Sequence, residues 1–337
     1  MATIKDVAKL SGVSVSTVSL VLNTTKEQRR VSPETWEKVR KAMDTLGYRP
    51  NKEARNLRDS AKQIPTIGLF WPYHFDADIL GRVLTFMHDA FESAYYDCNI
   101  VVHMFQAGKL NEYTEFTKPK ALEGAVLAML GDEDIEWLEK TNVVLPVVLL
   151  DREIAPYNTV RADNREMGRI GARMLIGNAC KKTAILRMKD EGRAGRKRLE
   201  EFLKLYDDNG IEYKTFEYED EADPEDIVRS VRSIIGEYRP DSIALFENDT
   251  IASTSMFAIL SSSVKVPDEM KLVTVNMGLD EHMRLFSPSV TAVYAPAERM
   301  VADCANILVR HITDRTADIV HKAYPPEIYY GQSCPRC

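Results

Sequence analysis

Three short helices are predicted at the start of the chain by the spacing of its hydrophobic residues. Apolar residues recur every three or four positions up to Gly12, which stands where a helix C-terminus favours a left-handed residue. Ser14 is placed to cap a second helix over residues 15–23, and Pro33 and Gly47 mark the two ends of a third. Only a few residues join the first two helices, so they must cross steeply, as in a helix-turn-helix. On this pattern alone, a plain helical bundle and a protein-docking module stay open beside DNA binding.

From residue 64 onward, apolar runs rich in β-branched residues alternate with helical patterns. Strands are predicted over residues 66–71, 100–104, 125–130, 144–150, 183–186, 242–246, 271–275 and 291–294. Helices are predicted over residues 79–96, 166–176, 198–209, 223–238 and 250–261. Such alternation is typical of parallel sheets with helices on both faces, and the strands are too many for one sheet. We therefore expect a small all-α domain followed by a bilobed α/β domain.

Charge is divided unevenly between these two parts. The 337-residue chain has a net charge of −7, but residues 1–60 hold 12 basic and 7 acidic residues, a balance of +5. The remainder holds 32 basic and 44 acidic residues. A basic N-terminal part on an acidic remainder indicates that only the first part approaches nucleic-acid phosphates.

Several other classes of protein are disfavoured. The longest apolar run, residues 143–150, is too short to cross a bilayer, and the first residues do not look like a secretory signal. Five scattered cysteines argue for a reducing compartment, and the CxxC at residues 334–337 has no second pair of metal ligands at suitable spacing. The six histidines lie far apart, and no HExxH, GxSxG, P-loop or GxGxxG motif occurs. We expect a cytoplasmic protein that is not an enzyme and has neither cofactor nor metal.

The individual residues of the first fifty positions are more specific than their pattern. The informative stretches are Thr3-Ile4-Lys5-Asp6-Val7-Ala8, Gly12-Val13-Ser14, Thr17-Val18-Ser19, Asn23, Val31-Ser32, Leu46-Gly47-Tyr48 and Pro50-Asn51. In this order they closely resemble the opening of the LacI/GalR family of bacterial transcription regulators. The resemblance implies a helix-turn-helix DNA-binding domain over residues 1–50.

The resemblance also implies how the second helix binds DNA. It would lie in the major groove, with Val15, Ser16 and Leu20 at base-reading positions. Thr17, Ser19 and Asn23 are placed to contact phosphates or to fix the helix. The other residues expected to bind DNA are Thr3, Ser14, Tyr48 and Asn51. Leu20 departs from the arginine of most members, which forms two hydrogen bonds with guanine, whereas leucine offers only an apolar contact. The operators of the family therefore cannot be carried over to this chain.

Residues 51–63 resemble the hinge helix of the family. That helix orders only on the correct DNA, pairs with its twin in the minor groove and wedges a leucine between base steps. Ala54 and Leu57 stand at the matching positions, and Arg55 is placed to reach a flanking phosphate. A charged linker is the alternative interpretation of the same segment.

Shorter matches further along resemble the effector domain of the family, which is similar to periplasmic sugar-binding proteins. They include Ile67-Gly68-Leu69, Asp151-Arg152, Asp163-Asn164, Gly168, Asn248-Asp249 and Val266-Pro267. The implied fold has two lobes, each a doubly wound parallel sheet, within an effector-binding and dimerisation domain over residues 64–337. The expected N-lobe comprises about residues 64–163 and 292–323, and the C-lobe about residues 164–291 and 324–337.

A small-molecule effector is expected in the cleft between the lobes, beyond the carboxyl ends of the strands. The residues assigned to it are Trp71, Tyr73, Phe75, Asp151, Arg152, Arg198, Asn248, Asp249 and Tyr294. Carboxylates, guanidinium groups and aromatic faces together suit a polyol. The alternatives are an exposed ion pair for Asp151 and Arg152, a helix cap for Asp249, and simple packing for the aromatic residues.

Several departures from the family pattern suggest a pocket unlike that for a standard sugar. They are Glu200-Glu201, Asn276-Met277-Gly278, Ala297, and Gly331 where an arginine is usual. The leading hypothesis is a homodimeric repressor of a pseudo-palindromic operator, controlled by a sugar-like effector. A regulator controlled by a protein partner, and a solute-binding protein without DNA function, are the competing hypotheses.

Overall fold

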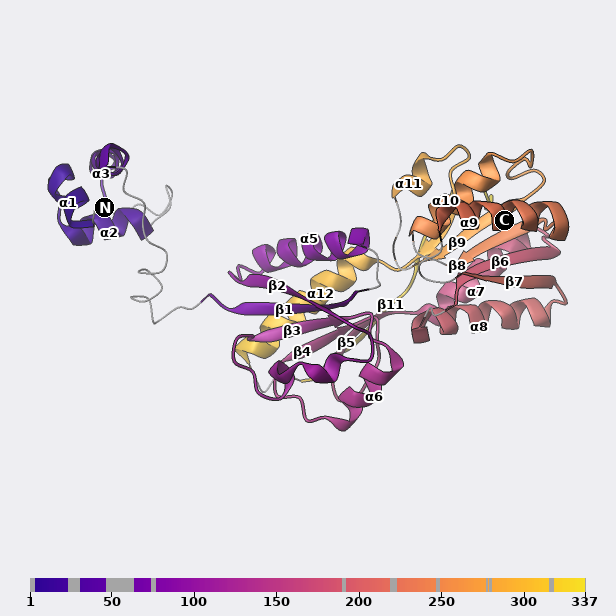
Figure 1. The fold of residues 1–337 in the computed structure, drawn as a ribbon, viewed down its shortest axis with the longest axis horizontal. Helices are drawn as coiled ribbons and strands as arrows, with labels where there is room; N and C mark the ends of the chain where they lie inside the picture. Colours follow the sequence, from indigo (N-terminus) through magenta and orange to yellow (C-terminus); the bar gives the residue numbers. More distant parts are fainter. Residues whose placement is uncertain are drawn as a thin grey trace. The chain divides into compact units, whose positions relative to one another are not determined.

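The chain divides into two compact units, a helical head over residues 1–64 and an α/β body over residues 65–337 (Figure 1). The computed structural model describes residues 4–23, 31–46, 64–73, 77–189, 192–218, 223–246, 249–276, 278, 281–314 and 318–336. The hinge expected over residues 51–63 lies outside the described residues.

Three helices form the head, α1 (Ile4–Ser11), α2 (Val15–Asn23) and α3 (Pro33–Leu46). Their shared core consists of Val7, Ala8, Val18, Val21, Val39 and Ala42. Gly12, at φ +68°, turns the chain out of α1, because a residue without Cβ adopts this conformation at no steric cost. Ser14 caps α2, since its Oγ accepts a hydrogen bond from the backbone N–H of Thr17 at 3.1 Å. The predicted helix-turn-helix and third helix are confirmed.

The N-lobe of the body is built on a six-stranded parallel sheet in the order β11-β5-β4-β3-β1-β2. Its strands are β1 (Thr66–Pro72), β2 (Asn99–Phe105), β3 (Gly124–Ala128), β4 (Val147–Leu150), β5 (Asn158–Ala162) and β11 (His321–Tyr324). Helices α5 (Ala77–Ser93) and α12 (Ala297–Thr313) pack together, and α12 lies against β3, β4 and β5. On the opposite face, α6 (Asp132–Lys140) buries Ile135 and Leu138.

The C-lobe has a second six-stranded sheet in the order β12-β10-β9-β8-β6-β7, parallel except for β12. Its strands are β6 (Lys182–Met188), β7 (Glu212–Tyr218), β8 (Ser242–Phe246), β9 (Lys271–Asn276), β10 (Thr291–Tyr294) and β12 (Glu327–Tyr329). One face carries α7 (Asn164–Gly177) and α8 (Gly192–Asp208), and the other carries α9 (Pro224–Ser233) and α10 (Asp249–Leu260) (Figure 1). A short helix, α11 (Glu281–Leu285), follows β9. The predicted fold of two mostly parallel sheets with helices on both faces is confirmed.

The chain crosses between the lobes three times, after β5, after β10 and after β11. Because β10 pairs with β9, the second crossing follows Tyr294 rather than residue 291. The first crossing lies near residue 163 and the third near residue 324. One buried hydrophobic cluster includes residues of both lobes, so apolar packing as well as the three crossing segments connects them.

Several strands and helices of the structure are not predicted by the hydrophobic pattern of the sequence. Strands β5, β7, β11 and β12 were not predicted, nor were helices α6 and α12. The edge strand β7 contains Glu212, Lys214, Thr215 and Glu217 among three aromatic residues, and this polar content hides it from a search for apolar runs. Helix α8 begins at Gly192 and not at Arg198, because the basic run between them is compatible with an exposed helical face.

Helices α7 and α8 approach each other closely at a glycine. A Cβ atom built on Gly168 of α7 would lie 1.9 Å from the carbonyl oxygen of Arg198 in α8. That oxygen belongs to the backbone, so the clash could be relieved only by moving a helix. The position of Arg198 therefore depends on Gly168.

We expect Gly168→Ala to lower the free energy of unfolding of the body by about 1–3 kcal/mol, because it forces α7 and α8 apart. Urea unfolding of the full chain, followed by circular dichroism, measures this loss. Gly236→Ala is the matched control, since a Cβ at that position meets nothing within 4 Å. It should leave stability unchanged or raise it by up to about 1 kcal/mol. Equal unfolding midpoints for the two variants would contradict the assigned contact.

Candidate functional site

Helix α2 of the head presents its first turn to solvent. Val15 is 39% exposed, and Ser14 and Ser16 are exposed, with their Oγ atoms 2.7 Å apart. Val18 and Val21 are buried on the opposite side. Because a helix has 3.6 residues per turn, positions 16, 19, 20 and 23 share the side away from that core. The exposed first turn of α2 is therefore available to a partner of the head.

The structure describes only some of the other residues expected to bind DNA. Thr17 is partly buried and its Oγ1 lies 2.8 Å from Ser14 Oγ. Ser19, Leu20 and Asn23 belong to α2, but their side chains are not described. Outside the described residues lie Thr3, Tyr48, Asn51, Ala54, Arg55 and Leu57.

In the body, Asp151 is a buried residue that ties together the end of the N-lobe sheet. It is 4% exposed and has φ +55° at the end of β4. Its Oδ1 accepts hydrogen bonds from the backbone N–H of Ala162 and from Nδ2 of Asn164, both at 3.1 Å. The alternative of an exposed ion pair at the strand end is therefore wrong for Asp151.

Arg152 is a buried guanidinium fixed by N-lobe carbonyl groups. It is 6% exposed, its Nε donates to Leu130 O at 2.8 Å, and its Nη1 donates to Asp151 O at 2.7 Å. The nearest carboxylate oxygen, Asp151 Oδ2, lies 3.8 Å from Nη1, so the charge is only partly balanced. Burial lowers the pKa of Arg152, and the charges of Arg198 and Arg193 lower it further, whereas those of Asp151 and Asp132 raise it.

The remaining nitrogen of Arg152 faces the other lobe. A Cβ atom on Gly192, the first residue of α8, would lie 3.4 Å from Nη2 of Arg152. No described residue accepts a hydrogen bond from this nitrogen. The two lobes thus meet where a buried cation of one faces the start of a helix of the other.

A second contact joins the lobes beside the first. Asp132, at the start of α6, accepts hydrogen bonds from Arg193 Nε at 2.6 Å and from Arg196 Nη2 at 2.7 Å. Burial raises the pKa of Asp132, but the hydrogen bonds and charges of Arg196 and Arg193 outweigh it, so the pKa is lowered overall. Asp132 is not among the residues that the sequence predicts for the site. The run of arginines can be recognised in the sequence, but no sequence pattern identifies Asp132 on the other lobe as its partner.

Arg198 lies farther along α8 and is partly buried. Its Nη1 is 3.4 Å from Val275 O, a long hydrogen bond, and its buried Nε has no partner among the described residues. Besides burial, the positive charge of Arg198 lowers the pKa of Arg152. Each is a guanidinium with unused donors.

The other residues assigned to the effector are more scattered. Trp71 is fully buried within the hydrophobic core, and Tyr73 is 60% exposed. Tyr294 is partly buried at the end of β10. Asp249 begins α10, but its side chain is not described, and Phe75 and Asn248 lie outside the described residues.

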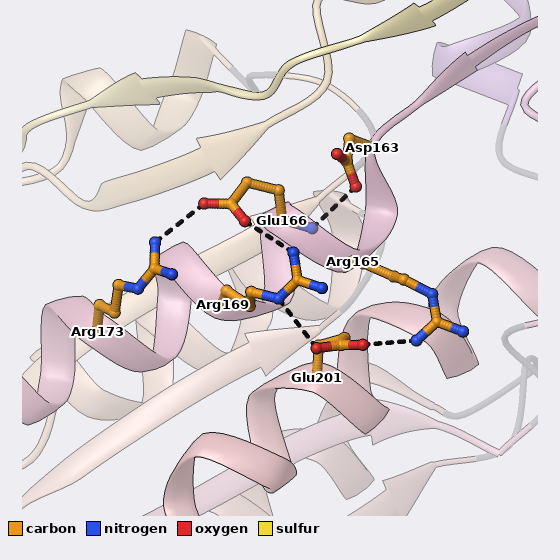
Figure 2. Close-up of polar contacts among 6 residues, drawn as sticks. All are labelled: Asp163, Arg165, Glu166, Arg169, Arg173 and Glu201. Atoms are coloured by element: carbon orange, nitrogen blue, oxygen red, sulfur yellow. Dashed lines mark hydrogen bonds and ion pairs between the residues drawn. The ribbon is translucent and has the colours of Figure 1, made fainter.

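Glu201, one of the departures from the family pattern, belongs to an ion-pair network between α7 and α8 (Figure 2). Its carboxylate accepts hydrogen bonds from Arg165 Nη1 at 2.6 Å and from Arg169 Nε at 3.0 Å. Glu166 links Arg169 to Arg173 on the same face of α7. Glu201 therefore joins α7 to α8, and this role explains its departure from the family pattern without a change in the effector pocket.

Two family models match this chain. Residues 3–51 match the model of bacterial regulatory proteins of the lacI family, and residues 172–334 match that of periplasmic binding protein-like domains. The chain belongs to the LacI family of bacterial regulatory proteins.

Named relatives of this LacI-family chain span almost its whole length. The HTH-type transcriptional repressor PurR of Mannheimia succiniciproducens is 28% identical over 344 residues, covering 99% of this chain and 98% of that protein. The sucrose operon repressor of Streptococcus mutans is 27% identical and covers 92% of this chain and 91% of its own length. The chain is accordingly a DNA-binding transcriptional repressor and not an enzyme.

Solved structures share the fold. The lac repressor dimer bound to operator and the anti-inducer ONPF has a TM-score of 0.73 at 22% identity, over 99% of both chains. The CelR–cellobiose complex has a TM-score of 0.65 at 21% identity, over 99% of this chain and 100% of that chain. Of the helices that the structure describes, none is both long and apolar enough to cross a membrane.

The ion pairs of Glu201 should make stability depend on pH. The hydrogen bond from Arg165 lowers the pKa of Glu201, burial opposes this, and Arg169 lowers the pKa again. A carboxylate with a lowered folded-state pKa stabilises the fold above its usual pKa of 4.5, and this is lost as pH falls further. We expect Glu201→Gln to lower the Tm at pH 7 by about 2–4 °C, the shift for about 1 kcal/mol in a unit of this size.

Thermal unfolding of the full chain between pH 7 and pH 3 measures the effect. The difference in Tm between wild type and Glu201→Gln should shrink toward pH 3. Glu200→Gln is the matched control, because Glu200 is exposed and has no ion-pair partner in the described part of the chain. Parallel curves for wild type and Glu201→Gln would show that these ion pairs do not stabilise the fold.

Proposed function

We propose that this chain is a homodimeric repressor that binds a pseudo-palindromic operator and changes its affinity when a small molecule binds between the lobes. The head over residues 1–50 reads DNA, residues 51–63 form a hinge, and residues 64–337 bind the effector and dimerise. The protein works in the cytoplasm, where its operator is. A sugar or sugar derivative is the effector class favoured by the polar residues assigned to the cleft.

DNA reading by α2 is supported by its free face. Its first turn is exposed, whereas Val18 and Val21 hold the helix against α1 and α3. Val15, Ser16 and Leu20 are the proposed base-reading residues, and Thr17, Ser19 and Asn23 the proposed phosphate contacts. The lac repressor structure with bound operator, which has the same fold, supports this assignment.

The observation that carries the effector part is the meeting of charged groups across the lobes. Arg152 is held by the N-lobe, whereas Arg193, Arg196 and Arg198 belong to α8 of the C-lobe. A ligand that contacts both sets favours the closed arrangement by the difference between its affinities for the two arrangements. The CelR–cellobiose complex supports a small molecule as the signal.

Selection from a random duplex library with the purified full chain tests the DNA function. We expect a two-fold symmetric site, because two copies present two identical heads. Ser16→Ala should reduce discrimination at one base pair of each half-site by roughly tenfold, within the 1–3 kcal/mol typical of one mismatched pair.

Thr45→Ala is the control, since Thr45 is exposed on α3 and its hydroxyl donates to Lys41 O. It should leave the selected site unchanged. Selection that yields no site preferred over random duplex would contradict the proposal and favour a solute-binding protein. Operator binding that no small molecule alters would favour control by a protein partner.

A groove on the C-lobe offers a surface for the second copy. It has a volume of about 640 Å³ and runs between α9 and α10, lined by Val228, Arg229, Arg232, Ser253, Thr254 and Phe257 among others. Phe257 is 60% exposed, an unusual state for a large apolar side chain on a regular helix. Burying it against a second copy fits a family in which the lac repressor is crystallised as a dimer.

Phe257→Asp should weaken the dimer by roughly a hundredfold or more, since burying one such side chain contributes about 1.5–3 kcal/mol and a two-fold interface counts it twice. Sedimentation velocity over a range of concentrations measures the shift to monomer. Val144→Asp serves as the control, because Val144 is 53% exposed on the N-lobe, away from this groove. A dimer unchanged by Phe257→Asp would place the interface elsewhere.

A further inference from the structure

The guanidinium group of Arg152 is buried where the lobes meet, and its own lobe balances its charge only in part. Arg152 is 6% exposed, yet its nearest carboxylate oxygen lies 3.8 Å away. The other oxygen of Asp151 is already engaged by Ala162 and Asn164. Buried charges in proteins are stable when they are paired and hydrogen-bonded, so a cation left in this state favours an incoming anion.

Each lobe contributes one donor group without an acceptor among the described residues. Nη2 of Arg152 faces Gly192 at the start of α8, with no acceptor among the described residues. Nε of Arg198 is buried and also lacks a partner in the part of the chain that the structure describes. The N-terminal end of α8 adds the partial positive charge of a helix dipole to these two guanidinium groups.

A carboxylate already bridges the lobes at the same end of α8. Asp132 from the N-lobe is held by Arg193 and Arg196, at 2.6 and 2.7 Å. This internal contact shows that the first turns of α8 bind an oxyanion presented by the N-lobe. Since Asp132 uses Arg193 and Arg196, it leaves Arg152 and Arg198 for a second oxyanion.

We propose that the effector carries an oxyanion, a phosphate ester or a carboxylate, and that this group binds between Arg152 and Arg198 at the start of α8. The inference rests on the proposed function and narrows its effector class from sugars in general to acidic or phosphorylated small molecules. A planar guanidinium group donates two parallel hydrogen bonds to such an oxyanion. One group held by both lobes also couples binding to their closure.

Thermal unfolding of the full-length, DNA-free protein tests the inference. The probes are inorganic phosphate against sodium chloride at matched ionic strength, and glucose against glucose 6-phosphate and glucuronate. Inorganic phosphate tests the charge site whatever the rest of the effector is, and the two glucose derivatives distinguish a phosphate from a carboxylate. We expect the oxyanion probes to raise the Tm by several degrees near saturation, and chloride and glucose to leave it unchanged.

Variants assign the shift to the two arginines. Arg198→Gln should abolish the stabilisation by oxyanions, as should Arg152→Gln if circular dichroism shows that it folds. Arg173→Gln should retain it, because Arg173 is 58% exposed and pairs with Glu166 on α7. If Arg152→Gln does not fold, the measurement on Arg198→Gln decides the test.

Three outcomes would overturn the inference. They are an equal shift with glucose, a shift that survives Arg198→Gln, and no shift above the chloride control with any oxyanion. Operator binding, measured on the same preparations, keeps the two proposals separate. A protein that prefers its selected operator and responds to a neutral molecule retains the proposed function and loses only the oxyanion. A protein without any preferred operator loses the proposed function itself.

Discussion

The body depends on one buried pair of charged residues at the end of β4. Asp151 joins the ends of β4 and β5 to the first residue of α7, and Arg152 binds the chain just after β3. These bonds lie where the chain leaves the N-lobe for the first time. A buried carboxylate and guanidinium cost free energy to desolvate, and removing either would leave the other uncompensated. The pair therefore fixes the end of the N-lobe sheet in one arrangement, and with it the place where α7 and the C-lobe begin.

The position that Asp151 and Arg152 fix for the start of α7 also affects the C-lobe, because α7 packs against α8. Asn164 begins α7, Gly168 brings α7 against the backbone of α8 at Arg198, and Glu201 holds the two helices by ion pairs. The start of α8 then faces Arg152 and Asp132 across the lobes. The same few residues thus set the packing of α7 on α8 and the polar surface between the lobes. A change in lobe closure would act on this surface first, because it is made of charges whose energy falls steeply with distance.

Much of the head and the class of fold could be predicted from the sequence, because local signals determine them. Gly12, Ser14 and Pro33 mark helix boundaries by their own backbone chemistry, and these boundaries are found in the structure. The edge strands β7 and β12 lack a continuous apolar run, so periodicity did not identify them. Helix α12 has a regular apolar stripe through Met300, Cys304 and Leu308, although it is not among the helices predicted from the sequence. The contact of Asp132 with α8 joins residues about sixty positions apart, and no local pattern encodes such a pairing.

The departures from the family pattern also gain a physical meaning from the structure. Glu201 is satisfied by Arg165 and Arg169. Gly331 stands where a Cβ atom would lie 2.5 Å from Ser289 O, so the backbone itself excludes the usual arginine. These two changes are compensated within the C-lobe and say little about the ligand. The informative groups are instead two guanidinium nitrogens without an acceptor among the described residues, Nη2 of Arg152 and Nε of Arg198, because buried donors in proteins are usually hydrogen-bonded. By that criterion, the chemical class of the effector is indicated by Arg152 and Arg198 rather than by the positions where the sequence departs from the family pattern.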